Sequence, residues 1–122
     1  MKEGSFGTHV YMISRLYRDL EKEVRTMKMF LIIYGEAADE YVIAALKEAG
    51  IRAYTKMVEA RGEGTETEPK LGTHFWPGKN NVLLMAVADE QIPGISERIR
   101  ALKQDHPRAG VRSFLLPMEE TL

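Results

Sequence analysis

The sequence offers one candidate site for an anionic ligand, built from loop glycines and a basic residue. Gly62 and Gly64 flank a glutamate directly after a predicted strand. Backbone N–H groups without neighbouring side chains can approach a phosphate closely. The pattern is short, and a simple loop hinge would use the same residues. Arg108, like Arg61 and Lys79, is a candidate for anion contact, although most such side chains are solvated surface charges.

A histidine and a tryptophan form a second candidate site. His74 and Trp76 are two residues apart, so both side chains point to one side if this segment is extended. Such a pair suits a metal ion, or a planar ligand held against the indole ring. A closed zinc site needs four ligands, so Glu66, Glu68 or His106 would have to converge on His74, within one chain or across a subunit boundary. The alternative is that Trp76 packs as an anchor at the base of the loop, with His74 half-exposed.

The same patterns give little support to catalysis. Ser5, Ser96 and Ser113 have no neighbouring base and no nucleophile-elbow motif. The chain contains no P-loop and no dinucleotide fingerprint. We therefore expect a protein that is not an enzyme, while a small enzyme would need a polar cleft with perturbed carboxylates.

The elements that position these residues follow from the hydrophobic pattern. Residues 30–34 and 82–88 are continuous apolar runs, which is typical of strands buried on both faces. Residues 54–59 and 111–116 are mixed and predict half-buried strands. Asp39 and Asp89 are candidate caps of two helices, one ending at Gly50 and the other at His106.

The order of these elements predicts an α+β fold. It is β-α-β-β-α-β, the ferredoxin-like arrangement, with a four-stranded antiparallel sheet and two helices on one face. The first and third strands are central in this arrangement, in agreement with their apolar sequences. The loop between the second and third strands is acidic, which predicts a solvated and mobile segment that can face a basic partner.

Two helices cover one face of the sheet, although the central strands are apolar on both faces. Burying one Leu or Ile side chain contributes roughly 1.5–3 kcal/mol, so an uncovered face favours association. Either other copies of the chain or a helix at residues 10–25 would supply the cover. We favour self-association.

The first 27 residues form a separate N-terminal extension, and the predicted domain spans residues 28–122. Apolar residues at helical spacing predict a helix within the extension. Residues 22–24 can also be encoded by a nucleotide run that matches a bacterial ribosome-binding site, a few nucleotides upstream of the Met27 codon. Met27 or Met29 is therefore a candidate natural start, and we leave both interpretations open.

Composition excludes several classes of protein. The 122 residues carry a formal net charge of -1 and no cysteine, so we expect no nucleic-acid partner, no disulfides and no thiolate metal site. The sequence has no apolar run of about 20 residues, the length needed to span a bilayer, and no secretory pattern at its start. We expect no membrane insertion and a cytoplasmic location.

From Phe30 to Leu122 the sequence resembles the PII nitrogen-regulatory superfamily. The likeness lies in the apolar first strand, Glu-Ala-Gly-Ile at 48–51, the glycines at 62 and 64, and Phe-Leu-Leu-Pro-Met-Glu-Glu at 114–120. Gly-Thr-His-Phe-Trp-Pro-Gly at 72–78 is similar to short PII-like proteins that are often encoded beside metal-efflux transporters.

The resemblance implies a homotrimer whose clefts between subunits hold adenine nucleotides. It also implies that the loop 60–81 contacts a target protein, which makes a membrane transporter a candidate partner. Two departures count against typical nucleotide binding and nitrogen control. Arg108-Ala109-Gly110 stands where typical members of the family have a phosphate-binding Gly-Asp-Gly-Lys turn. The loop tyrosine that is modified in some members is also absent, because no tyrosine lies between Thr55 and Val82. The loop residues that we assign to partner contact are Glu66, Glu68, His74, Trp76 and Lys79.

The preferred hypothesis is therefore a PII-like trimeric signal-transduction protein that senses a small ligand and acts through the loop 60–81. The candidate ligand residues are Gly62, Gly64 and Arg108. The alternative is a metal-binding or metal-tolerance protein linked to an efflux transporter, with His74 as a ligand of a divalent metal.

Overall fold

The computed structural model describes Arg15 and residues 26–122. The predicted helix at residues 10–25 and the question of the start codon fall outside the described residues, apart from Arg15. The boundary of the extension at residue 27 therefore stays a prediction. Within the described residues, no helix is long and apolar enough to cross a membrane.

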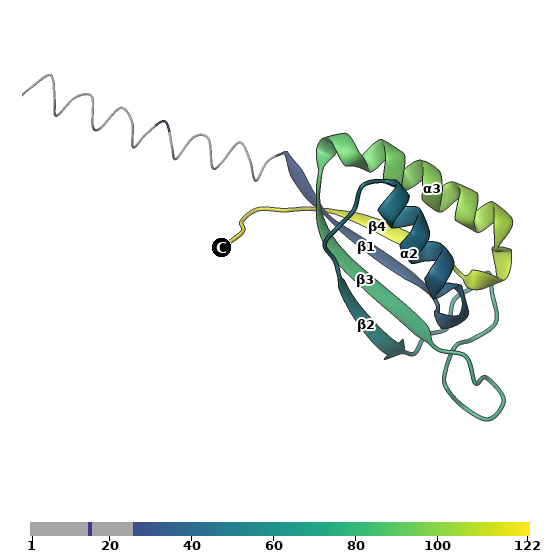
Figure 1. Ribbon diagram of the computed structural model, residues 1–122. Coiled ribbons are helices and arrows are strands. Elements are labelled where there is room, and N and C mark those ends of the chain that lie inside the picture. The colour runs from purple at the N-terminus through teal and green to yellow at the C-terminus, as the bar shows by residue number, and fades with distance from the viewer. Residues whose placement is uncertain (1–14, 16–25) are drawn as a thin grey trace, which may run out of the picture.

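Four strands form one antiparallel sheet in the order β2-β3-β1-β4. They are β1 (Met27–Gly35), β2 (Thr55–Ala60), β3 (Asn80–Ala88) and β4 (Arg112–Pro117). The two continuous apolar runs are the central strands β1 and β3, as the sequence predicts (Figure 1). Both extend a few residues beyond their apolar runs, because pairing continues over the whole register from Met27 opposite Ala88 to Gly35 opposite Asn80.

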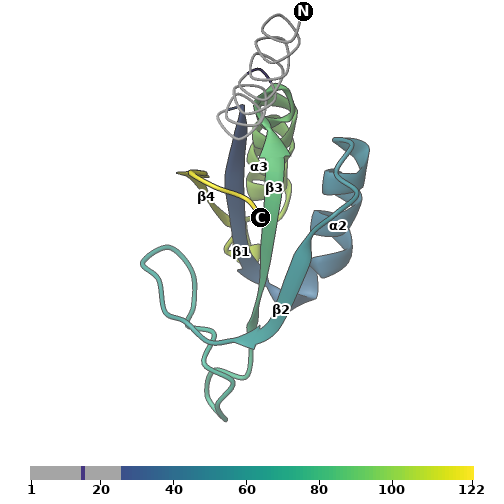
Figure 2. The same cartoon turned by 90° about the vertical axis from the view of Figure 1, so that its left-hand side faces the viewer.

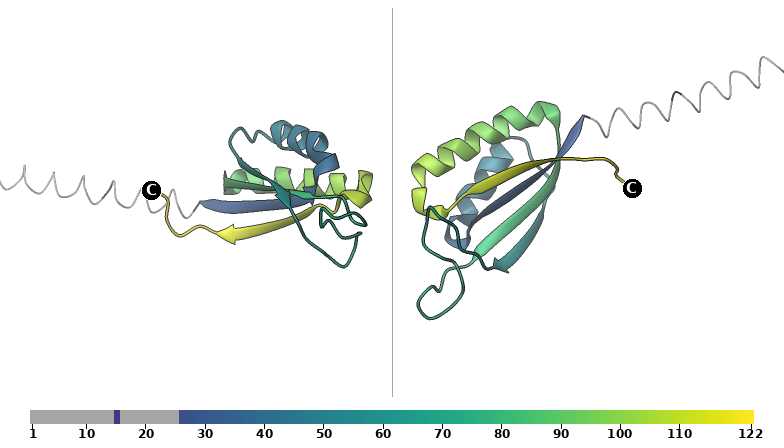
Figure 3. Two further views of the ribbon diagram at one scale, coloured as in Figure 1. Left: turned by 90° about the horizontal axis from the view of Figure 1, so that it is seen from below. Right: turned by 180° about the vertical axis from the view of Figure 1, so that it is seen from behind.

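Two helices, α2 (Asp39–Glu48) and α3 (Ile92–Asp105), lie side by side on one face of the sheet (Figures 2 and 3). Short 3-10 turns, at Glu36–Ala38, Asp89–Gln91 and Pro107–Ala109, precede or follow them. This confirms the predicted ferredoxin-like α+β fold. The core between helices and sheet contains the side chains of alternate residues of β1 and β3 and one stripe of each helix. Its largest fully buried members are Tyr34, Ile32, Leu83, Ile95, Val42 and Val87.

The predicted capping roles of Asp39 and Asp89 are wrong. Each helix starts after a 3-10 turn and has no side-chain cap at its first residue. Asp89 instead pairs with the Lys28 ammonium at 3.0 Å. At the turn before α3, the Gln91 side chain accepts a hydrogen bond from the backbone N–H of Ala88 at 3.0 Å. Both aspartates therefore serve tertiary contacts rather than helix ends.

The Asp39 carboxylate joins α2 to three strands. It accepts hydrogen bonds from the Tyr34 hydroxyl at 2.5 Å, the Lys56 ammonium at 2.8 Å and the Asn81 amide at 3.1 Å. Burial opposes the charge and raises the pKa of Asp39, but these three donors outweigh burial, so the pKa lies below its ordinary value. Burial and the bond to Asp39 raise the pKa of the Tyr34 hydroxyl. The charged Asp39 carboxylate therefore holds α2 against the sheet in the native fold.

The second face of the sheet is apolar, and we call it the open face. Neither helix lies over it, and the loop between β2 and β3 reaches only its end, near Ile33 and Val82 (Figure 3). Its residues alternate with the buried core residues along each strand, and the register aligns Leu31 with Phe114 and Leu84, and Met29 with Leu116. An apolar surface of this kind normally marks an interface. The open face consists of Met29, Leu31, Ile33, Met57, Val82, Leu84, Phe114 and Leu116.

Candidate functional site

Backbone hydrogen bonds divide the loop between β2 and β3 into two lobes. Gly62 and Lys70 exchange two backbone hydrogen bonds of 2.8 Å, and the N–H of Gly72 donates to the carbonyl of Gly78 at 3.0 Å. These bonds separate a first lobe (residues 63–69), which lies beside the sheet, from a second lobe (residues 73–77), which projects beyond the end of the sheet (Figure 2).

The chain enters this loop through an irregularity at the end of β2. The register against β3 shifts between Met57 and Ala60, and Glu59 adopts a left-handed backbone conformation with φ of 61°. Such a conformation is costly for a residue with a side chain. The Glu59 carboxylate lies 3.9 Å from the Lys79 ammonium at the other end of the loop, so this bulge sets the direction of the loop.

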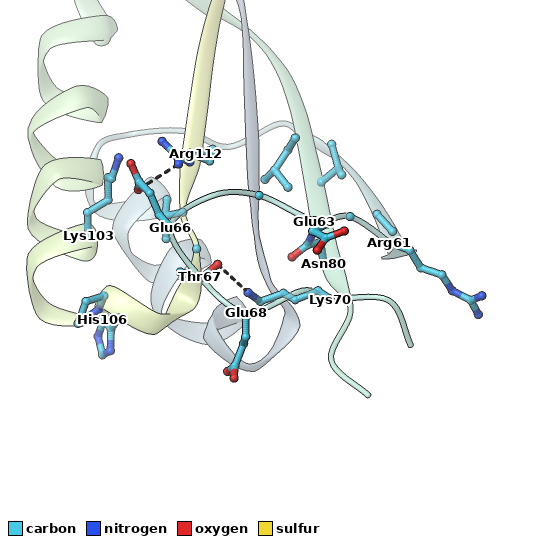
Figure 4. A pocket seen from close by; sticks show the side chains of 18 residues that line it. Arg61, Glu63, Glu66, Thr67, Glu68, Lys70, Asn80, Lys103, His106 and Arg112 are labelled. Atoms are coloured by element: carbon cyan, nitrogen blue, oxygen red, sulfur yellow. Dashed lines mark hydrogen bonds and ion pairs between the residues drawn. The ribbon is translucent and has the colours of Figure 1, made fainter. Parts of the chain in front are cut away.

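A cavity of about 460 Å³ lies between the first lobe, the ends of β1, β3 and β4, and the last turn of α3 (Figure 4). The predicted ligand residues Gly62 and Gly64 line it, together with Glu66 and Glu68 from the predicted partner loop. The structure therefore brings these two groups to one site. It adds basic side chains that the sequence had not assigned to the ligand. These are Lys70, Lys103, His106 and Arg112.

A second cavity of about 550 Å³ lies beside the first and shares Lys70 with it. Arg108 and Lys79 line this second cavity, as does Tyr41, whose ring stacks on His106 with a centroid distance of 4.2 Å. Within one chain, Arg108 therefore does not line the cavity that contains Gly62 and Gly64, and its place in a cleft between subunits stays a prediction. The 3-10 turn Pro107–Ala109 places it on the neighbouring side.

Among residues 26–122, two basic side chains of the first cavity, Lys70 and Lys103, have no acidic partner, whereas Arg112 has one. Arg112 Nη2 lies 3.0 Å from Glu66 Oε2. The Lys70 ammonium donates a hydrogen bond of 3.4 Å to the Thr67 hydroxyl, and among residues 26–122 no ion pair involves Lys70 or Lys103. These ammonium groups are available to an anion.

The Lys70 side chain passes between two glycines at the junction of the cavities. A Cβ atom on Gly35 would lie 2.8 Å from Lys70 Cε, and one on Gly110 would lie 3.1 Å from both Lys70 Nζ and Thr67 Oγ1. Gly110 also has a left-handed φ of 65°. Both glycines therefore leave room for the lysine that anchors the first lobe.

Replacing Gly110 should loosen the first lobe as well as lower stability. We expect Gly110→Ala and Gly50→Ala each to lower the free energy of unfolding by roughly 1–2 kcal/mol, because both glycines have positive φ. Only Gly110→Ala also displaces Lys70 and Thr67, since a Cβ on Gly50 meets nothing within 4 Å. Urea unfolding with amide exchange of residues 63–69 tests this. Equal exchange of the lobe in both variants would contradict it.

The second lobe differs from its prediction. Residues 72–76 are bends rather than an extended piece, because the N–H of Thr73 donates to the carbonyl of Trp76 at 2.8 Å and the N–H of Trp76 to Thr73 Oγ1 at 3.1 Å. The segment is therefore not extended, so strand alternation does not place His74 and Trp76 on one side. Trp76 is 41% exposed and Phe75 84% exposed, so the tryptophan does not act as a buried anchor.

The structure does not assemble the predicted metal site. His74 is exposed, and its ring meets the edge of Phe75 at a centroid distance of 5.6 Å. Within the part of the chain that the structure describes, no three His, Asp or Glu side chains lie close enough together to hold a metal ion. His74 has no convergent ligand among the described residues.

The nitrogen regulatory protein P-II family model matches residues 27–122. The chain belongs to this family. The match covers the whole described sheet, both helices and the two-lobed loop, so the site lies within the P-II domain. A search of curated proteins gave no match.

Solved structures with the P-II fold resemble the chain at low sequence identity. CPII from Thiomonas intermedia K12 bound to ADP and bicarbonate is 20% identical, with a TM-score of 0.59 over 73% of this chain and 82% of that chain. CPII bound to ADP, AMP and bicarbonate is 18% identical, with a TM-score of 0.60 over 79% of this chain and 93% of that chain. A PII-like signaling protein from Thermus thermophilus is 24% identical, with a TM-score of 0.55 over 73% of this chain and 83% of that chain. These similarities establish the fold.

Proposed function

We propose that this P-II family protein is a trimeric, cytoplasmic signal-transduction protein rather than an enzyme. It binds a small ligand in clefts between subunits and acts on a target protein through the loop 60–81. The observation that carries this proposal is the position of the first cavity, which lies under the first lobe at one end of the open face. A ligand there contacts the loop and the edge of the interface together.

The cavity and the open face share residues. Ile33 and Val82 line the cavity and belong to the open face, and they are opposite each other in the register of β1 and β3. When other copies cover the open face, they also approach this side of the cavity. The composition of the cavity wall therefore supports a cleft between subunits.

The ligand that this cavity favours is an adenine nucleotide together with a small carboxylate-like anion. One structure of Thiomonas intermedia CPII contains ADP and bicarbonate, and the cavity in this chain offers Lys70, Lys103 and Arg112 to negative charge. Backbone N–H groups near Gly64, where a Cβ atom would meet nothing within 4 Å, remain accessible to phosphate oxygens. Lys70 and Lys103 would bind the phosphates in place of the Gly-Asp-Gly-Lys turn, which this chain lacks.

The second lobe is the part of the loop that suits a target protein. His74, Phe75 and Trp76 are all exposed and adjacent at its tip. Exposed aromatic side chains are favourable anchors at protein interfaces. We propose that this aromatic tip docks on the target, for which a membrane transporter is the candidate.

Nucleotide binding provides the direct test. We expect calorimetry to detect ADP binding to the wild-type protein, and Lys70→Gln to weaken it by about tenfold or more, because a hydrogen bond to a charged group contributes about 1.5–3 kcal/mol. Lys47→Gln, at an exposed position of α2, is the control and should bind ADP as the wild type does. The absence of ADP binding, or equal losses in both variants, would overturn the proposal.

A further inference from the structure

The ion pair between Glu66 and Arg112 joins the loop to the sheet at the candidate site. Glu66 lies on the first lobe, whereas Arg112 is the first residue of β4. We infer that Arg112 and Lys103 form a subsite for a small carboxylate-type anion, and that the Glu66 carboxylate competes with that ligand for the subsite. The inference rests on the proposed function and specifies how its ligand acts on the loop.

The contact itself shows which ligand chemistry the subsite accepts. A guanidinium presents a planar fork of N–H donors that matches a carboxylate. The Glu66 Oε2 atom lies 3.0 Å from Arg112 Nη2, so the space in front of Arg112 already holds a carboxylate group. Acetate and bicarbonate present the same planar pair of oxygen atoms, and they therefore fit where the Glu66 side chain lies.

Glu66 is easily displaced because its ion pair is solvated. The side chains of Arg112 and Glu66 are 41% and 63% exposed, and ion pairs of this kind contribute little to stability. Elsewhere the first lobe is held by the Gly62–Lys70 hydrogen bonds at its base and by the weak Lys70–Thr67 bond. Glu66 can therefore move away without disturbing the sheet.

Lys103 makes the subsite more favourable for a free anion than for Glu66. It lies in the last turn of α3 and extends toward the same part of the cavity as Arg112 (Figure 4). Among residues 26–122, no carboxylate forms an ion pair with Lys103. A free anion can settle between both cations, whereas Glu66 is tethered to the lobe.

Competition at this subsite couples ligand binding to the loop. An anion that replaces Glu66 removes one of the few contacts that hold the first lobe against β4. Because binding and loop release compete for the same arginine, the ligand favours the released lobe by the free energy difference between the two contacts. The loop therefore responds to the anion even when no large part of the fold moves.

The neighbouring glutamates provide a matched test. Glu63 and Glu68 line the same cavity, and neither forms an ion pair with a described residue. We expect Glu66→Gln to bind acetate about fivefold more tightly than the wild type, as removal of an exposed ion pair implies. Glu63→Gln and Glu68→Gln change the charge equally but should remain within about twofold. Calorimetric titration at constant ionic strength, repeated with bicarbonate, measures these differences.

Two further measurements separate the subsite from general charge effects. Arg112→Gln should weaken acetate binding by about tenfold or more, with an unchanged far-UV spectrum as the check on folding. Acetate should speed amide exchange of residues 63–69 in the wild type, while Glu66→Gln should exchange quickly without acetate.

The outcomes distinguish this inference from the proposed function. If ADP binds but Glu66→Gln and Glu68→Gln behave alike, or if acetate binds to neither the wild type nor Glu66→Gln, the subsite is wrong. If the acetate pattern holds but ADP does not bind, the nucleotide part of the proposed function is wrong and the subsite stands.

Discussion

Two lysines on the open face should separate the proposed trimer into single chains. Phe114 and Leu116 are 49% and 46% exposed in one chain and lie on the open face of β4. If other copies bury them, Phe114→Lys/Leu116→Lys removes apolar contacts worth roughly 1.5–3 kcal/mol per chain, because only about half of each side chain is still exposed before association. The lysines must also lose water on association. We expect the mass from light scattering at about 10 μM to fall from that of three chains to that of one, a more than hundredfold weakening.

The same strand supplies the control for this prediction. Leu115 is also 46% exposed, but it pairs with Phe30 and, like Ser113, lies on the helix side of the sheet. Ser113→Lys/Leu115→Lys therefore adds the same charge to β4 and should leave the assembly intact. A single-chain mass for the wild type, or equal dissociation of both double variants, would count against an interface on the open face.

Loss of assembly should also remove ligand binding. The first cavity shares Ile33 and Val82 with the open face, so a cleft between subunits cannot form in single chains. We expect the dissociated variant to lose ADP affinity although its own cavity residues are unchanged. Retention of wild-type affinity by single chains would place the binding site within one subunit.

The sequence predicts the sheet well because burial on both faces leaves a local signal. A central strand must be apolar at every position, and the runs 30–34 and 82–88 show this pattern without reference to any distant residue. The order of elements then restricts the topology, because crossover handedness leaves few arrangements. The edge strand β2 is less regular, and no local pattern indicates the left-handed backbone of Glu59 at its end.

Local rules fail where distant residues compete for the same side chain. Asp39 and Asp89 have the residue type and position of helix caps, yet both carboxylates face cations brought close by the fold. Lys56 comes from β2 and Lys28 from β1. For Asp39, a cap interaction would be one hydrogen bond to the backbone, whereas its ion pair with two additional donors is stronger. Sequence spacing does not show these partners.

The candidate site is predicted only in part for a similar reason. The glycines at 62 and 64 are recognisable because they are adjacent in the sequence. Lys70, Lys103 and Arg112 come from a loop, a helix end and a strand start, and only the fold brings them together. What the sequence does show is that these residues lie near the ends of predicted elements. In the fold, those ends border the same cavity. Arg108 also lies near such an end, but its turn directs it to the second cavity.

Replacing Asp39 should cost more stability than any other single charge in the described fold. Its carboxylate accepts three hydrogen bonds, and its partner Lys56 is only 26% exposed. Asp39→Asn leaves the Lys56 ammonium without a counter-charge and weakens the bond from Tyr34. We expect a loss of roughly 2–4 kcal/mol in the free energy of unfolding at pH 7, measured by urea titration. Glu40→Gln, next in the sequence, exposed and without an ion pair among the described residues, should change stability by less than about 0.5 kcal/mol.

The pH dependence of this difference identifies the charge as its cause. The donors around Asp39 hold its pKa in the folded protein below the ordinary value that it has in the unfolded chain. Its stabilisation is therefore complete above the unfolded pKa and is lost as the pH falls through the folded pKa. The wild type should lose stability in acid faster than Asp39→Asn, so that the two unfolding curves converge below about pH 4. A gap that stays constant from pH 7 to pH 3 would mean that the shape of the side chain, and not its charge, ties α2 to the sheet.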